Sequence, residues 1–175
     1  MKLQSAIKRL HEFDMKGHYV YRHGDLRKLF IEDSERAFNT GLKRLLNAGV
    51  LEQVVRGVYV YCLSSKTKSV DTIEHIVKAL RRGEYNYISL ESALSEYGVI
   101  SQIPIDRLTI MSTGRKGEYK TPYGVIEITH TKRSVSDIMN SIYRSERPLR
   151  VATQDAAIRD LRRVGRNLHL LPESY

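Results

Sequence analysis

Apolar and polar positions follow their most regular pattern between residues 34 and 61, where they predict a helix followed by a hairpin. Apolar residues recur at three- and four-residue spacing from Ala37 to Leu46, which marks one buried helix face. Ser34 precedes this face and is a favourable N-cap, because its hydroxyl can accept a hydrogen bond from a first-turn backbone N–H. Two β-prone runs then flank Arg56-Gly57, and such a two-residue connection indicates a β-hairpin.

The polar face of this helix is basic and rich in hydrogen-bonding groups. It carries Arg36, Asn39, Thr40, Lys43 and Arg44. Two apolar patterns before it predict helices over residues 4–13 and 24–30, with a short strand at 19–21. Residues 31–33 have the length of the turn in a helix-turn-helix, whose second helix enters the major groove of DNA. The whole pattern predicts an N-terminal winged helix-turn-helix domain over residues 1–66.

We expect different exposed side chains of this domain to contact the bases and the phosphates of DNA. Asn39 and Thr40 are short and neutral and suit base edges, whereas Lys43 and Arg44 can reach bases or phosphates. Arg56 at the hairpin tip suits a minor groove or a phosphate. The other members of the predicted set are the phosphate anchors Arg22, Arg27 and Lys28, together with Ser34 and Arg36. The alternative is an ordinary solvated helix face.

The charge of the chain favours a polyanionic partner. The 175 residues carry a formal net charge of +9 and a pI near 9.7. Residues 1–70 hold 13 of the 29 Lys and Arg residues but only 7 of the 20 Asp and Glu residues. Because basic surfaces attract nucleic acids and anionic membranes alike, charge supports the DNA-binding prediction only in combination with the helix-turn-helix pattern.

Several classes of protein are disfavoured by the sequence. Cys62 is the single cysteine, so a disulfide within the chain and a cysteine-based zinc site are both excluded. No second histidine lies at ligand spacing from His75 or His130, and we expect neither a metal nor another cofactor. The N-terminus lacks the apolar core of a signal peptide, and no apolar run is long enough to span a bilayer. We therefore expect a cytoplasmic protein without a membrane partner.

Residues 67–175 predict a second domain of mixed α+β class. The polar stretch at 64–69 has no apolar periodicity and marks the boundary. Apolar patterns predict a small, mainly antiparallel sheet beside several helices. The expected helices span 72–82, 90–97, 135–143 and 155–164, and the expected strands span 85–89, 108–112, 118–121 and 125–131.

Two groups of residues in this second domain could carry chemistry. One is a basic cluster near the hairpin turns, which is either a solvated loop or an extension of the DNA-binding face. It consists of Arg115, Lys116, Lys120, Lys132 and Arg133. The other is Asp106 with Glu118-x-Lys120, a pattern found in metal-dependent nucleases, where acidic ligands hold Mg²⁺. Accident is the favoured explanation of that pattern in a chain that is 28% charged, and we expect no enzymatic activity.

Several stretches resemble the AbiEi antitoxins of abortive-infection systems. The pattern Leu45…Gly49-Val50-Leu51…Arg56-Gly57-Val58-Tyr59 resembles the winged helix of that family, although many bacterial regulators share it. More specific likenesses, in chain order, are residues 88–94 (ISLESAL) with Tyr97-Gly98, residues 112–124 (STGRKGEYKTPYG), residues 127–133 (EITHTKR) and residues 151–161 (VATQDAAIRDL). The resemblance covers nearly the whole chain.

The resemblance implies a DNA-binding antitoxin of a type IV toxin–antitoxin system, active in phage defence. Its winged helix would bind inverted repeats in its own promoter and repress the operon. Its C-terminal domain would counteract a nucleotidyltransferase-type toxin without a stable complex. We expect a monomer that can pair on double-stranded DNA. Two alternatives are a metal-dependent nuclease and a winged-helix module that binds protein or RNA.

Overall fold

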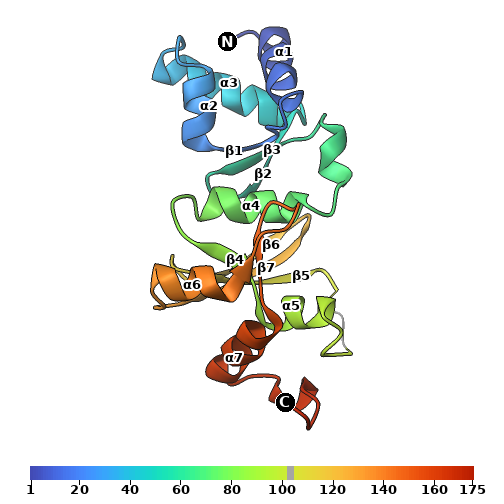
Figure 1. Cartoon of the computed structure of the whole chain (residues 1–175). Coiled ribbons are helices and arrows are strands. Elements are labelled where there is room, and N and C mark those ends of the chain that lie inside the picture. Colours follow the sequence, from blue (N-terminus) through green and yellow to red (C-terminus); the bar gives the residue numbers. More distant parts are fainter. Residues whose placement is uncertain (102–104) are drawn as a thin grey trace. The chain divides into compact units, whose positions relative to one another are not determined.

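The chain forms two compact units, which are described separately. The computed structural model describes residues 1–101 and 105–175 (Figure 1). The first unit runs from Met1 to Thr72 and the second from Ile73 to Tyr175. The boundary expected from composition, after residue 66, lies six residues before this division. Within the described ranges, no helix is long and apolar enough to cross a membrane.

The first unit consists of three α-helices and a three-stranded antiparallel sheet. The strands lie in the order β1-β3-β2, so the last strand of the unit is the central one. The elements in chain order are α1 (Leu3–Asp14), β1 (Val20–Arg22), α2 (His23–Leu29), α3 (Glu35–Asn47), β2 (Leu51–Val55) and β3 (Val58–Tyr61), followed by a 3-10 turn at Ser65–Lys68. Each helix and strand lies where the hydrophobic pattern predicted one.

Local chemistry explains why α3 and the hairpin form. The Ser34 hydroxyl accepts a hydrogen bond from the Ala37 backbone N–H at 3.2 Å, which confirms the predicted N-cap. Phe38 and Leu45 are buried on the apolar face of α3. Gly57 closes the β2–β3 turn with a φ of +79°, a left-handed conformation that glycine adopts without steric cost. These short-range features therefore define the helix–turn–hairpin stretch.

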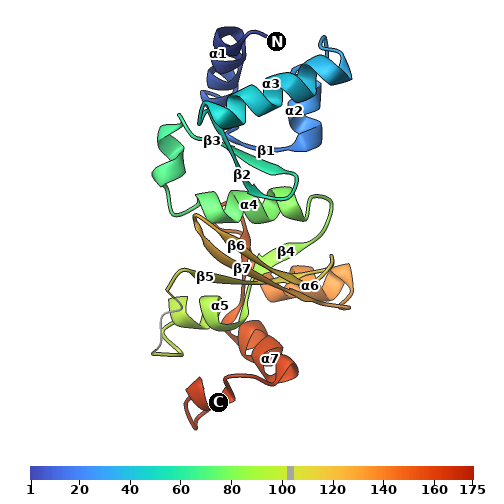
Figure 2. The same ribbon diagram turned by 180° about the vertical axis from the view of Figure 1, so that it is seen from behind.

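The second unit contains a six-stranded sheet with helices on both sides. Its strands lie in the order β6-β7-β5-β4-β9-β8. Figures 1 and 2 show α4 on one side of this sheet and α5 with α7 on the other. The elements are α4 (Thr72–Leu80), β4 (Asn86–Ile88), α5 (Leu90–Glu96), β5 (Arg107–Ser112), β6 (Gly117–Thr121), β7 (Gly124–His130), α6 (Val135–Ser141), β8 (Ile142–Tyr143), β9 (Arg150–Ala152) and α7 (Gln154–Val164), with a 3-10 turn at Leu168–Leu170.

This sheet is larger and more mixed than the sequence predicted. The pairs β5–β7 and β4–β9 are parallel, and the other three pairs are antiparallel. Strand β6 forms a hairpin with β7 but lies at the outer edge, so β7 comes to lie beside β5. Strands β8 and β9 were not predicted, because runs of two and three residues are too short to show a period of two. The predicted helix over 135–143 accordingly ends at Ser141.

Candidate nucleic-acid interface

The outward face of α3 presents the side chains that the sequence singled out. All five of them are exposed, and the buried face of the same helix contains Phe38, Leu42 and Leu45. Gly41 lies on the buried side as well, where an added Cβ would come within 2.8 Å of the Met1 Sδ atom. The five exposed residues are Arg36, Asn39, Thr40, Lys43 and Arg44.

Arg27 holds the turn between α2 and α3. Its Nη1 donates to the Phe30 carbonyl oxygen and its Nη2 to the Asp33 carbonyl oxygen, both at 2.9 Å. The guanidinium carbon also lies 5.5 Å from the centre of the Phe38 ring, within the range of a cation–π interaction. Because both terminal nitrogens bond within the turn, Arg27 has a structural function, and phosphate anchoring by this residue stays a prediction.

The remaining cations of the first unit lie on α2 and on the hairpin. Arg22 is the N-terminal cap residue of α2, and its backbone N–H donates to the Asp25 Oδ2 atom at 2.9 Å. The Arg22 side chain is exposed, as is that of Arg56 at the β2–β3 turn. Both side chains are therefore accessible to a polyanion.

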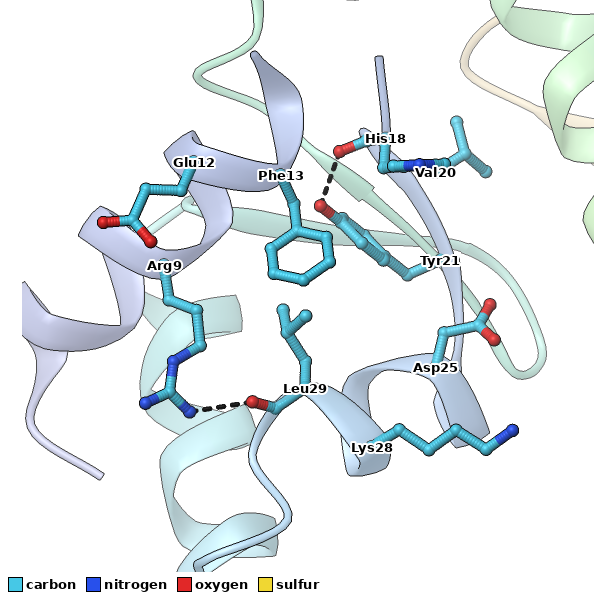
Figure 3. A pocket seen from close by; sticks show the side chains of 9 residues that line it. All are labelled: Arg9, Glu12, Phe13, His18, Val20, Tyr21, Asp25, Lys28 and Leu29. Carbon is cyan, nitrogen blue, oxygen red and sulfur yellow. Dashed lines mark hydrogen bonds between the residues drawn. The ribbon is translucent and has the colours of Figure 1, made fainter. Parts of the chain in front are cut away.

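Lys28 lies at the rim of a hollow of about 500 Å³ between α1, β1 and α2. Figure 3 shows the Phe13 ring and the Leu29 side chain pointing toward one another in its middle. The Arg9 Nη1 atom donates to the Leu29 carbonyl oxygen at 2.7 Å, which joins α1 to α2. Lys28 is exposed and shares this lining with Arg9, Glu12 and Phe13 of α1, and phosphate anchoring by this residue stays a prediction.

His23 connects the hairpin to α3, a role that sequence reasoning missed. Its backbone N–H donates to the Gly57 carbonyl oxygen at 2.9 Å. Its ring lies edge-on to the Phe38 ring, with 5.4 Å between the ring centres. A single histidine in a polar stretch has no periodicity, so no sequence signal marked this contact. His23 therefore helps to hold the hairpin tip, with Arg56, against the helical part of the unit.

In the second unit, four of the five predicted basic residues are exposed. Arg115 and Lys116 lie on the β5–β6 loop, which is held by a 2.8 Å hydrogen bond from the Arg81 Nε atom to the Arg115 carbonyl oxygen. Lys120 lies on β6, and Lys132 follows β7. No sequence pattern marked Arg81 for this role.

Arg133 differs from the rest of this basic cluster. Its side chain is only 17% exposed, and its Nη2 atom lies 3.5 Å from the Oδ1 atom of the buried Asp160. The structure therefore places Arg133 in an internal ion pair and leaves Arg115, Lys116, Lys120 and Lys132 as the accessible members of the cluster.

The three residues of the nuclease-like pattern do not converge. Glu118 and Lys120 share one face of β6, as predicted, but Glu118 forms a 3.0 Å ion pair with Arg107. Glu118 on β6 lies beside Glu127 on β7, which in turn lies beside Thr109 on β5. Asp106 directly precedes β5 and is three residues from Thr109. That offset corresponds to roughly 10 Å along the strand, with one strand between them. No group of three His, Cys, Asp or Glu side chains in the described residues could hold a metal.

Comparison with known proteins identifies a related fold but no family. No family model matches the chain, and no curated protein matches it. A crystal structure of the RV2827C protein from Mycobacterium tuberculosis is similar, with a TM-score of 0.53 and 14% sequence identity. The similarity covers 78% of this chain and 48% of that protein, so the chain spans about half of its length. At this identity the comparison shows a shared fold alone.

Proposed function

We propose that this chain is a winged helix-turn-helix protein that binds double-stranded DNA and represses its own promoter. The element order α1-β1-α2-α3-β2-β3 supports the proposal, because a winged helix-turn-helix requires two helices joined by a short turn and a two-stranded hairpin after them. In this arrangement α3 is the recognition helix and the β2–β3 hairpin is the wing. Arg56 at the wing tip would contact the adjacent groove or backbone.

The polar face of α3, whose side chains have no internal partners in the described chain, is the main support for DNA binding. In the part of the chain that the structure describes, none of its five exposed side chains makes an internal hydrogen bond or ion pair. Three of them are cationic and two are short neutral groups. Such a set can neutralise phosphates and also read base edges.

The antitoxin part of the proposal rests on the resemblance to the AbiEi family. Under it, the second unit counteracts a nucleotidyltransferase-type toxin without forming a stable complex. Two of the resembling stretches pack together, since the Ser89 hydroxyl, in residues 88–94, donates to the Asp160 carboxylate, in residues 151–161. The test is co-expression with such a toxin, in which the chain should restore growth and a chain with a disrupted second unit should not.

DNA binding is tested first, by fluorescence anisotropy of the full chain on its own upstream DNA. We expect tighter binding to this duplex than to a scrambled duplex, with a steep decrease in affinity as the salt concentration rises. Inverted repeats should be filled by one monomer per half-site. Equal and weak binding to both duplexes would contradict the repressor proposal.

RNA binding and DNA cleavage, measured on the same protein, distinguish the two alternatives. An interaction module for RNA would bind a single-stranded or hairpin RNA more tightly than either duplex. A metal-dependent nuclease would cleave DNA when Mg²⁺ is added, and Lys120→Ala would abolish the cleavage. The separation of Asp106 from Glu118 across the sheet leads us to expect no cleavage.

A further inference from the structure

A second hollow, of about 460 Å³, lies within the second unit. It is bordered by α4, by the segment leading into β4, by α6 and by the segment leading into β9. Its volume falls in the range of about 300–1,000 Å³ that small-molecule sites occupy. Among the described residues, the hollow contains none of the predicted DNA-binding set or of the basic cluster at residues 115–133.

The backbone around this hollow is held in place before any ligand binds. The Tyr85 N–H donates to the Thr113 Oγ1 atom at 3.0 Å, and the Thr113 N–H donates to the Tyr85 carbonyl oxygen at 3.1 Å. On the opposite border, the Leu149 N–H donates to the Oε2 atom of Glu74, which is only 1% exposed. Arg147 also binds Glu74 through its Nε atom at 2.7 Å. A site that is already ordered loses little conformational entropy when it binds.

The lining of the hollow contains apolar surface that no part of the described chain covers. Tyr85 is 42% exposed and Met139 is 43% exposed, while Ile142 and Leu149 form more deeply buried parts of the lining. A ligand that covers such apolar surface removes it from water, which favours binding. An aromatic ring fits this lining, because tyrosine rings pack against other rings and methionine sulfur contacts them favourably.

Two cations at the same hollow also lack strong partners. In the ranges that the structure describes, neither Lys78 nor Arg150 forms an ion pair, and the Arg150 Nη1 atom contacts only the Met139 Sδ atom, at 3.2 Å. A thioether is a weak acceptor, so an anion can replace it at little cost. The single acidic residue in the lining, Glu84, accepts a 2.6 Å hydrogen bond from the Thr113 hydroxyl. The charged lining groups therefore sum to a net positive charge.

We propose that this hollow binds a small aromatic anion. Its flat body would lie against Tyr85 and Met139, and its phosphate or carboxylate would be bound by Lys78 and Arg150. Apolar surface alone would select any hydrophobic compound, and the two cations alone would select any anion. Their combination selects molecules that carry both features. This site and the α3 face lie in different units of the chain, and the proposal does not depend on DNA binding.

The test is NMR titration of the full-length chain with four probes that separate the two features. AMP and indole-3-acetate each combine a ring system with an anionic group, as a phosphate and as a carboxylate. Adenosine lacks the anion, and inorganic phosphate lacks the ring. We expect at least one of the two aromatic anions to bind at least about tenfold more tightly than adenosine or phosphate. The amide shifts should be centred on residues 84–86, 149 and 150. The stronger of the two shows which combination of ring and anion the site prefers.

Substitutions in the lining test whether the ligand binds in this hollow. Arg150→Gln and Lys78→Gln should each weaken binding by about tenfold, which corresponds to the loss of a hydrogen bond to a charged group. Tyr85→Leu should also weaken binding, because leucine keeps a hydrophobic side chain but removes the ring against which the ligand would stack. Arg162→Gln is the matched control, because Arg162 is an exposed cation on α7 with no partner in the described chain. Binding of neither aromatic anion, or equal weakening by Arg162→Gln, would overturn the proposal.

Discussion

The Ser89 hydroxyl donates a 2.8 Å hydrogen bond to the Asp160 carboxylate, and both residues are completely buried. Ser89 follows β4 and Asp160 lies in α7, so this bond joins the sheet to a helix that is 71 residues away in sequence. The Tyr87 hydroxyl approaches the same carboxylate oxygen at 3.4 Å, and Arg133 approaches the other oxygen. The central part of the second unit thus contains a polar cluster within an apolar core.

Ser89→Ala should destabilise the second unit. The substitution leaves a buried carboxylate oxygen without its shortest hydrogen bond, and such losses cost about 1–3 kcal/mol. Urea unfolding monitored by circular dichroism measures this cost. Ser136→Ala is the control, because Ser136 is exposed on α6 and surface changes of this kind remain within about 0.5 kcal/mol. Equal stability of the two variants would show that the Ser89–Asp160 bond contributes nothing.

Asp160 should make the stability of the chain depend on pH. Burial raises the pKa of the Asp160 carboxyl above its ordinary value, against the opposing effects of the Ser89 hydrogen bond and of Arg133. The folded state then binds a proton more readily than the unfolded chain, so this group's contribution to stability is largest at low pH. It declines as the pH rises from about 4 through the raised pKa, and is constant above it.

Comparison of the chain with an Asp160→Asn variant isolates this effect. Unfolding free energies are measured for both between pH 4 and pH 7. The free energy of unfolding of the unmodified chain minus that of the variant should decrease as the pH rises. An increase over this range would mean that the Arg133 interaction outweighs burial and that the pKa of Asp160 is lowered.

Arg44→Ala and Asn39→Ala should each weaken binding to the upstream DNA by about 1–3 kcal/mol and relax the base preference. The reason is that both side chains project from the exposed face of α3 without an internal partner in the described chain. Anisotropy on the upstream duplex and on single-base variants of it measures both effects. Unchanged affinity for Arg44→Ala would mean that α3 is not the recognition helix.

Lys28→Ala should act differently, through phosphates alone. We expect a similar decrease in affinity for every duplex and a salt dependence reduced by about one unit of slope, because one phosphate contact is lost. Lys68→Ala provides a control cation in the 3-10 turn of the same unit. A change in base preference with Lys28→Ala would be inconsistent with its position beside α1.

Arg27→Ala should lower the stability of the first unit by about 2–3 kcal/mol. The variant loses the two hydrogen bonds to the carbonyl oxygens of Phe30 and Asp33, and bonds from charged donors are among the stronger ones. Arg27→Lys should not restore stability, since lysine lacks the planar fork that reaches two acceptors. Thermal unfolding measures this cost, and Arg22→Ala is the exposed control. Normal stability combined with weaker DNA binding would instead assign Arg27 to phosphate contact.

The sequence by itself determined the elements of the first unit, because local physics controls them. The apolar spacing of α3, the Ser34 cap and the Arg56-Gly57 turn each depend on residues fewer than five positions apart. Such features can be recognised from the local sequence alone. The exposure of Asn39, Arg44 and Arg56 follows from the same patterns.

Only the tertiary structure decided the strand order of the second unit and the partners of its charged groups. The parallel pairs depend on where β7 and β9 insert, and β9 is too short to be recognised from its sequence. Arg133 follows Lys132 in a basic stretch of the sequence, yet it pairs with Asp160, which lies 27 positions later in the chain. Lys78 and Arg150 lie 72 positions apart and line one hollow. Contacts between such distant positions have no periodic signature, because they form only when the whole chain packs around a shared core.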